Sequence, residues 1–162
     1  MLAVVDALRS QGMSISHNQI LHGLSRVVTN THLKGRWQLL SRRPTIVCDT
    51  GHNLDGIREV VRQLRAQSYR RLHMVIGMVK DKDVQSILEE LPRDASYYFC
   101  QASIPRALPA EDLRAAAEKA GLRGTTIADV NEAIHAAQQA ADENDFIFVG
   151  GSTFVVAEIE NL

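Results

Sequence analysis

The chain has 162 residues, enough for one domain with a buried core or for a small domain with an appendage. Its 45% hydrophobic and 23% charged residues are typical of a globular domain, and its net charge of −1 lacks the basic excess of a nucleic-acid binder. No apolar run approaches the ~20 residues needed to span a bilayer, and no signal peptide is evident. We therefore expect neither nucleic acid nor a membrane among its partners.

The two cysteines, Cys48 and Cys100, each end an apolar run and belong to no CxxC or Cys/His metal pattern. We expect both to be reduced and buried, which fits a reducing, cytoplasmic compartment.

The first part of the chain predicts a pair of helices. One covers residues 1–11, and the second follows Ser16, which with Gln19 matches a capping box. Residues 29–35 predict a linker. Because the pair has little apolar surface to bury by itself, we assign residues 1–34 to a separate helical unit.

From residue 35 onward, strand patterns alternate with helical patterns. Several strands are unbroken apolar runs, which is typical of a mostly parallel sheet covered on both faces. The sequence therefore predicts that residues 35–162 form one Rossmann-like α/β domain with five to six strands. The predicted strands cover residues 36–40, 45–48, 72–79, 96–100, 125–127 and 146–149, and the predicted helices cover residues 54–67, 84–91, 110–120, 130–141 and a last segment after 152.

The strand over residues 45–48 ends at Asp49 and a polar turn, and ligands of open α/β sheets bind at such carboxyl ends. Asp49 could accept hydrogen bonds from ligand hydroxyls or orient a cation. His52 and Asn53 could face a ligand near the next helix N-terminus, where the helix dipole favours anions. Alternatively, Asn53 only caps that helix and Asp49 only accepts turn amides. An Asp placed directly after a buried strand is costly to desolvate unless it has a partner.

Four further positions lie beside predicted strands, and each has two interpretations. Arg36 could bind a phosphate or stack on a base, or it could be a surface residue that lies over Trp37. Lys80 begins a charged loop that is either solvated or faces an anion. Arg106 could bind a carboxylate in a bidentate way, or it could be an exposed loop residue. Ser152 and the glycines before it could hold a carboxylate, or Ser152 could only cap the last helix.

Several motifs are missing from the sequence. There is no GxxxxGK[ST] and no GxGxxG, so any phosphate cradle has to come from elsewhere. There is also no HExxH, and the histidines are scattered, so the sequence predicts no metal site built from this chain alone.

Five segments together resemble the ordered signatures of folylpolyglutamate synthase/dihydrofolate synthase, a family of the Mur ligase superfamily of ATP-dependent amide-forming enzymes. The resemblance covers roughly residues 35–157, and residues 1–30 resemble the helices that close the family's preceding ATPase domain. The family commonly has Asp-Gly-Ala-His-Asn where this chain has DTGHN. The segments are GRWQ (35–38), DTGHN (49–53), GMVKDKD (77–83), PRA (105–107) and GS (151–152).

The resemblance implies a reaction with ATP and Mg²⁺ as cofactors. ATP phosphorylates the carboxylate of folate or dihydropteroate, and the amino group of L-glutamate then attacks the acyl phosphate. By position, Arg36 and Asp49 match contacts to ATP. His52, the implied catalytic residue, and Ser152 match positions near glutamate and the acyl phosphate. Lys80 and Arg106 are further candidates for the same anionic pocket.

The resemblance also places the family's P-loop, Mg²⁺ ligands and most pterin contacts in a domain that precedes this one. We therefore expect that Met1 is not the natural start, that these 162 residues alone do not ligate glutamate, and that the full-length enzyme is a monomer. The competing hypothesis is a stand-alone α/β module that binds glutamate or a nucleotide.

Overall fold

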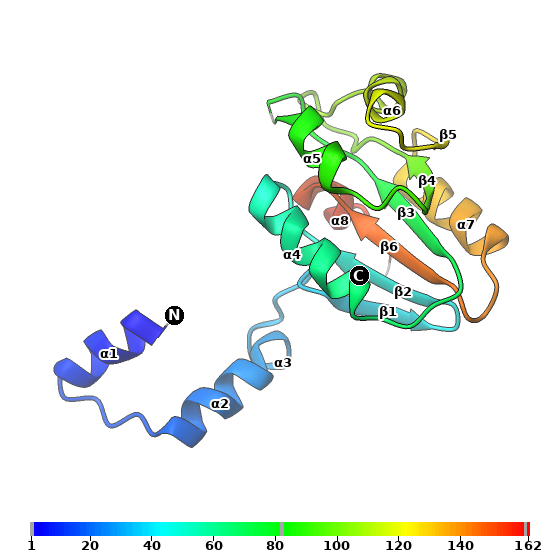
Figure 1. Cartoon of the computed structure of the whole chain (residues 1–162). Coiled ribbons are helices and arrows are strands. Elements are labelled where there is room, and N and C mark those ends of the chain that lie inside the picture. Colours follow the sequence, from blue (N-terminus) through cyan, green and yellow to red (C-terminus); the bar gives the residue numbers. More distant parts are fainter. Residues whose placement is uncertain (1, 82, 161) are drawn as a thin grey trace. The chain divides into compact units, whose positions relative to one another are not determined.

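A computed structural model describes residues 2–81, 83–160 and 162 of the chain (Figure 1). The chain divides into two compact units, residues 1–34 and residues 35–162. Lys82, part of the charged loop, and Met1 lie outside the described residues. Among the described residues, no helix combines the length and the apolar character needed to cross a membrane.

The first unit contains helices α1 (Leu2–Ser10), α2 (His17–Ser25) and α3 (Val27–Thr31). The predicted capping box is confirmed, because the Gln19 amide donates to Ser16 Oγ and the Ser16 amide donates to the Gln19 side chain.

The linker predicted over residues 29–35 is partly wrong, because α3 extends to Thr31. The Thr31 hydroxyl donates to the Val27 carbonyl at 2.6 Å, and the Asn30 amide donates to the Arg26 carbonyl at 2.8 Å. These bonds hold one helical turn together despite the low helix propensity of Val, Thr and Asn.

The second unit contains a six-stranded sheet with the order β1-β2-β6-β3-β4-β5. The edge strand β1 runs antiparallel to β2, and all other neighbours are parallel, as the predicted Rossmann-like α/β fold requires. The strands are β1 (Gln38–Arg42), β2 (Thr45–Asp49), β3 (Leu72–Ile76), β4 (Ser96–Phe99), β5 (Gly124–Thr126) and β6 (Phe146–Gly150).

Helices cover both faces of the sheet (Figure 1). Successive β6 residues alternate between the two cores, with Phe148 on one side and Ile147 and Val149 on the other. Helices α4 (Leu54–Arg65), α5 (Val84–Glu90) and α6 (Ala110–Lys119) pack on the Phe148 side, and α7 (Val130–Ala140) and α8 (Thr153–Ala157) pack on the other.

Several strand boundaries differ from the prediction by one residue, and those of β1 and β3 differ by two or three. Strand β1 begins at Gln38 instead of residue 36, because Trp37 has a positive φ of 45°, which no strand residue adopts. Strand β3 ends at Ile76 instead of residue 79. Beyond Ile76 the chain leaves the sheet, and Val79 forms an antiparallel bridge with Ala107 in the loop after β4.

Both cysteines are free and fully buried, as expected. Burial, followed by the negative charge of Asp49, raises the pKa of the Cys48 thiol to about 12. Burial, followed by the charges of Glu158 and Asp129, raises the pKa of Cys100 to about 12. Both side chains therefore behave as small apolar groups of the core.

Candidate functional site

Four loops meet at one edge of the sheet because they follow the neighbouring parallel strands β2, β6, β3 and β4. This carboxyl edge is where an open α/β sheet binds ligands. The predicted site residues His52, Lys80, Arg106 and Ser152 all lie in these loops, and Asp49 is the last residue of β2.

The carboxylate of Asp49 joins two segments of the chain. One oxygen accepts the Trp37 amide at 2.7 Å, and the other accepts the Gly51 amide at 2.7 Å. The Thr50 amide also donates to the Gly35 carbonyl at 2.9 Å. Asp49 therefore holds the segment before β1 against the turn after β2, as the turn-amide interpretation expects.

Trp37 keeps its positive φ because its surroundings fix it. Its indole packs on Phe146 and Phe148, with ring centroids 6.2 and 6.3 Å away. Arg36 precedes this held residue. It is exposed, and its guanidinium makes no hydrogen bond or ion pair with any described residue.

His52 follows the turn that Asp49 braces. Its Nδ1 lies 3.0 Å from the Thr50 carbonyl oxygen, which can only accept, so Nδ1 is the donor. In the neutral ring Nε2 is then free to accept a proton. Asn53 caps α4 by accepting the Gly56 amide at 2.8 Å, which confirms its capping interpretation.

Ser152 caps the short helix α8, where its Oγ accepts the Phe154 amide at 3.2 Å. The Ser152 hydroxyl still has its own proton to donate. Gly151 before it has a φ of 87°, and a Cβ there would lie 2.8 Å from the Gly77 carbonyl oxygen. Only glycine fits this close approach between the loops after β6 and β3.

The loops after β3 and β4 are joined by main-chain hydrogen bonds. The Lys80 amide donates to the Arg106 carbonyl at 3.0 Å, and the Leu108 amide donates to the Met78 carbonyl at 2.9 Å. The position of Arg106 is thereby tied to the sheet, although its side chain is exposed.

A small hollow of about 80 Å³ lies among these loops. It brings together His52, Arg106 and Ser152, three of the predicted site residues. Lys80 does not line it, because its Nζ lies near the Pro105 carbonyl at 3.5 Å. Arg36 and Asp49 do not line it either. The hollow is lined by His52, Val79, Arg106, Ser152, Thr153 and Phe154.

Sequence reasoning missed two neighbours of Arg106. Its guanidinium carbon lies 5.4 Å from the centre of the Phe154 ring, and its Nη2 lies 3.2 Å from an Asp81 oxygen. Asp81 was visible only as part of a charged loop. Phe154 is 48 positions away from Arg106, so no local pattern could have indicated the contact.

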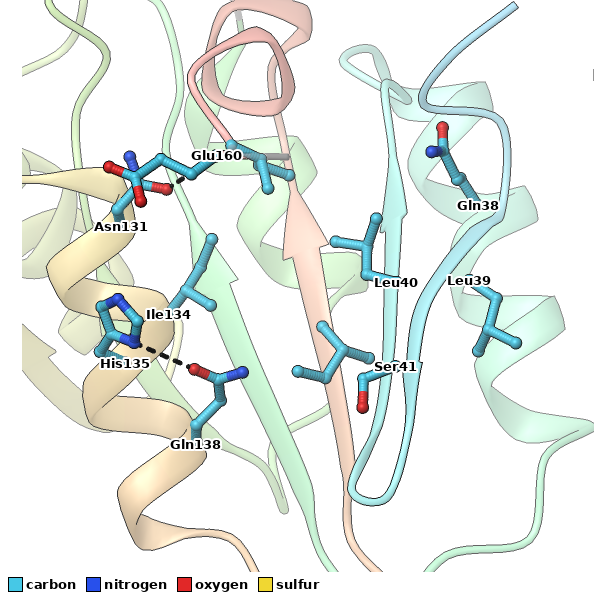
Figure 2. Close-up of a pocket in the computed structure, with 11 residues that line it drawn as sticks. Gln38, Leu39, Leu40, Ser41, Asn131, Ile134, His135, Gln138 and Glu160 are labelled. Atoms are coloured by element: carbon cyan, nitrogen blue, oxygen red, sulfur yellow. Dashed lines mark hydrogen bonds between the residues drawn. The ribbon is translucent and has the colours of Figure 1, made fainter. Parts of the chain in front are cut away.

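A larger hollow of about 320 Å³ lies between β1 and α7 (Figure 2). Leu40 and Ile134 project into it from opposite sides, and His135 bonds to Gln138 within α7. It contains none of the predicted site residues. Among the described residues, no three His, Cys, Asp or Glu side chains gather in a way that could hold a metal ion.

Comparisons with known proteins identify the family to which this chain belongs. Residues 35–153 match the family model of the Mur ligase glutamate ligase domain. The dihydrofolate synthase/folylpolyglutamate synthase of Escherichia coli is 31% identical over 94% of this chain and 35% of its own length. A probable bifunctional folylpolyglutamate synthase/dihydropteroate synthase of Haloferax volcanii is 35% identical over 83% of this chain and 16% of its own.

Solved structures give the same result. E. coli FolC in complex with DHPP and ADP superposes with a TM-score of 0.82 and 30% identity over 94% of this chain and 36% of that one. A bifunctional folylpolyglutamate synthase/dihydrofolate synthase with Mn, AMPPNP and L-glutamate bound superposes with a TM-score of 0.79, at 28% identity and the same coverage. The chain thus spans about a third of the E. coli relative and of these solved structures, and 16% of the Haloferax volcanii relative. It belongs to the Mur ligase family, as a glutamate ligase C-terminal domain of the folylpolyglutamate/dihydrofolate synthase type.

Proposed function

We propose that this domain supplies one half of the active site of an ATP-dependent ligase that joins L-glutamate to folate or dihydropteroate through an acyl phosphate. The observation that carries the proposal is the hollow shared by His52, Arg106 and Ser152 at the carboxyl edge of a glutamate ligase domain. A cation, a hydroxyl and an imidazole there suit an amino acid that brings carboxylates and an amino group.

The hollow's size suggests which part of the ligand it holds. At about 80 Å³ it is far below the ~300–1,000 Å³ of a site that encloses a drug-sized ligand, but it exceeds the ~30 Å³ that one water occupies. We therefore assign it to a single carboxylate group of L-glutamate, with Arg106 as the cation and the Ser152 hydroxyl as a donor.

His52 is assigned to the amino group of glutamate. Its Nδ1 is engaged with the Thr50 carbonyl, so Nε2 is the nitrogen available to accept a proton. An amine attacks a carbonyl only when it has lost its extra proton. The proposed role of His52 is to take that proton beside the hollow.

The nucleotide is assigned to the neighbouring segment, where the guanidinium of Arg36 is exposed and has no hydrogen-bond or ion-pair partner among the described residues. The main role assigned to Asp49 is to hold the segments that carry Arg36 and His52, through the two amides that donate to its carboxylate. Each carboxylate oxygen can accept a further hydrogen bond, here assigned to a ribose hydroxyl. With no P-loop motif and no carboxylate cluster for a metal among the described residues, we assign the phosphate cradle and the Mg²⁺ ligands to another domain.

Two measurements test this proposal on the 162-residue chain. In an NMR titration, L-glutamate should shift the signals of His52, Arg106 and Ser152, and AMPPNP should shift those of Arg36 and Trp37; L-lysine, with one carboxylate fewer, serves as the control. Shifts confined to residues outside the four loops would contradict the site. In a ligase assay with ATP, Mg²⁺, L-glutamate and dihydropteroate, the chain should form no product. Product formation would contradict the proposal that another domain supplies the rest of the active site. In the titration, tight binding of glutamate with no signal shift on adding AMPPNP would favour a stand-alone binding module.

A further inference from the structure

The side chain of Arg106 already has a carboxylate partner within the protein. Its Nη2 lies 3.2 and 3.4 Å from the two oxygens of Asp81, in the loop after β3. Both contacts use one nitrogen, so this is not the parallel two-nitrogen fork of a strong arginine–carboxylate pair. The side chains are also 54% and 58% exposed, which makes the pair weak and easily exchanged.

A second contact, with the ring of Phe154, fixes the orientation of the Arg106 guanidinium. The guanidinium lies over the ring of Phe154, 5.4 Å from the centroid. Such a cation–π contact uses the flat face of the group and leaves its N–H edge for hydrogen bonds. Phe154 lines the same hollow as Arg106 and is itself 38% exposed, so its ring is accessible to the guanidinium at the surface.

We propose that Asp81 is a stand-in for the ligand's carboxylate: it holds Arg106 on the Phe154 ring until an incoming carboxylate replaces it. The inference rests on the proposed glutamate site and adds two positioning residues to it. Asp81 competes with L-glutamate for Arg106 and so lowers the affinity for L-glutamate. Phe154 orients the guanidinium toward whichever carboxylate it binds and so raises that affinity.

Exchange is favourable because the two carboxylates meet Arg106 differently. Asp81 offers a solvent-exposed contact to one nitrogen, while a carboxylate in the hollow also meets the hydroxyl of Ser152, a residue that is only 2% exposed. Charge-assisted hydrogen bonds strengthen as water is excluded. The resting pair prevents the cation from settling on an unrelated surface group and costs little to break.

The test measures the L-glutamate affinity of the 162-residue chain by following the main-chain amide signals of His52 and Ser152 in NMR, because both residues line the hollow and are present in every variant. Asp81→Asn should bind about two- to fivefold more tightly, the range expected for losing one exposed competing ion pair. Phe154→Leu, which keeps an apolar residue in α8, should bind about two- to fivefold more weakly, as for an exposed cation–π contact. Asp94→Asn is the charge-matched control at the other end of β4 and should leave the affinity unchanged.

A double variant distinguishes two causes of tighter L-glutamate binding in Asp81→Asn: the loss of a competitor for Arg106, and the loss of a negative charge near the hollow. If Asp81 acts through Arg106, adding Asp81→Asn to Arg106→Gln should change nothing further. A gain that persists without Arg106, or equal affinity of Asp81→Asn and wild type, would overturn the inference while leaving the glutamate site intact. Absence of any glutamate response in all variants would instead overturn the proposed site, and the inference with it. In the ligand-free chain, the Arg106 signal must also move when Asp81 is replaced.

Discussion

The two edges of the sheet both carry arginine–aspartate pairs, but the pairs have different surroundings. At the amino edge, the Asp145 side chain is completely buried and accepts the Asp142 amide at 2.9 Å, the Arg71 amide and Nε at 3.1 Å, and His73 Nε2 at 3.3 Å. At the carboxyl edge, Arg106 is exposed and only one of its nitrogens meets a carboxylate. The Asp145 carboxylate has all its donors supplied by the protein, whereas Arg106 has N–H groups that its contact with Asp81 does not use.

This difference separates the roles of the two carboxylates: Asp145 stabilises the fold, and Asp81 leaves Arg106 available to a ligand. A buried carboxylate with all its donors supplied by the protein has no capacity for a substrate, and removing it strands its partners. His73 shows the same completeness, since its other ring nitrogen lies 3.3 Å from the Tyr98 hydroxyl. His52, by contrast, lines a hollow, and its Nε2 has no hydrogen-bond partner in the part of the chain that the structure describes.

The largest effect on stability is expected from Asp145→Ala. Because the variant leaves two main-chain amides and the buried His73 without an acceptor, it should lower the free energy of unfolding by about 3–5 kcal/mol. Urea unfolding at pH 7 measures this. Arg71 pairs with both Asp145 and the more exposed Asp142. Asp142→Ala should therefore lower the free energy of unfolding by less than about 1 kcal/mol. Equal losses in the two variants would contradict the distinction between the buried and the exposed carboxylate.

A smaller effect is expected from Asp49→Asn at the carboxyl edge. The new amide nitrogen cannot accept, so either the Trp37 or the Gly51 amide loses its partner, at a cost of about 1–3 kcal/mol. The single tryptophan reports the change directly, because its strained φ depends on this bond. Loss of the Trp37 bond should shift its fluorescence and the NMR signal of Arg36, and loss of the Gly51 bond should instead shift the NMR signal of His52. Unchanged fluorescence and signals would show that Asp49 does not brace these segments.

The pH dependence of stability provides a finer test of the amino edge. Burial acts to raise the pKa of the Asp145 carboxyl, but hydrogen bonds from Asp142, His73 and Arg71 outweigh it and hold that pKa below its usual range. The stabilisation is therefore complete above the unfolded-state pKa of about 3.9 and is lost as the pH falls further. The difference in unfolding free energy between wild type and Asp145→Asn should shrink below about pH 4. A difference that grew on acidification would contradict this.

The sequence predicts much of the fold because the signals are local. The Ser16 and Asn53 caps, the alternation of strands and helices, and the small residues at Gly151 are all readable within a few positions. The family resemblance predicts that His52, Arg106 and Ser152 share one pocket, and the structure brings these three residues together in one hollow.

The remaining features depend on contacts between distant positions. The start of β1 is set by the bond from Trp37 to Asp49, 12 positions away, and the Asp145–His73 network spans 72 positions. No local sequence pattern therefore indicates that His73 bonds to Asp145. The sequence predicts that Lys80 lies near the site. Its Nζ instead lies 3.5 Å from the Pro105 carbonyl oxygen, because the loops after β3 and β4 pair there.

The most direct test of the central claim compares two matched arginines, one at each edge. Arg106 pairs with Asp81 and Arg70 pairs with Asp142, and all four side chains are more than half exposed. Arg106→Gln should weaken L-glutamate binding about tenfold or more, because a hydrogen-bonded charge contributes about 1.5–3 kcal/mol. Arg70→Gln should leave the affinity unchanged. Equal affinities in the two variants, or a loss confined to Arg70→Gln, would contradict the assignment of the carboxyl edge as the glutamate site.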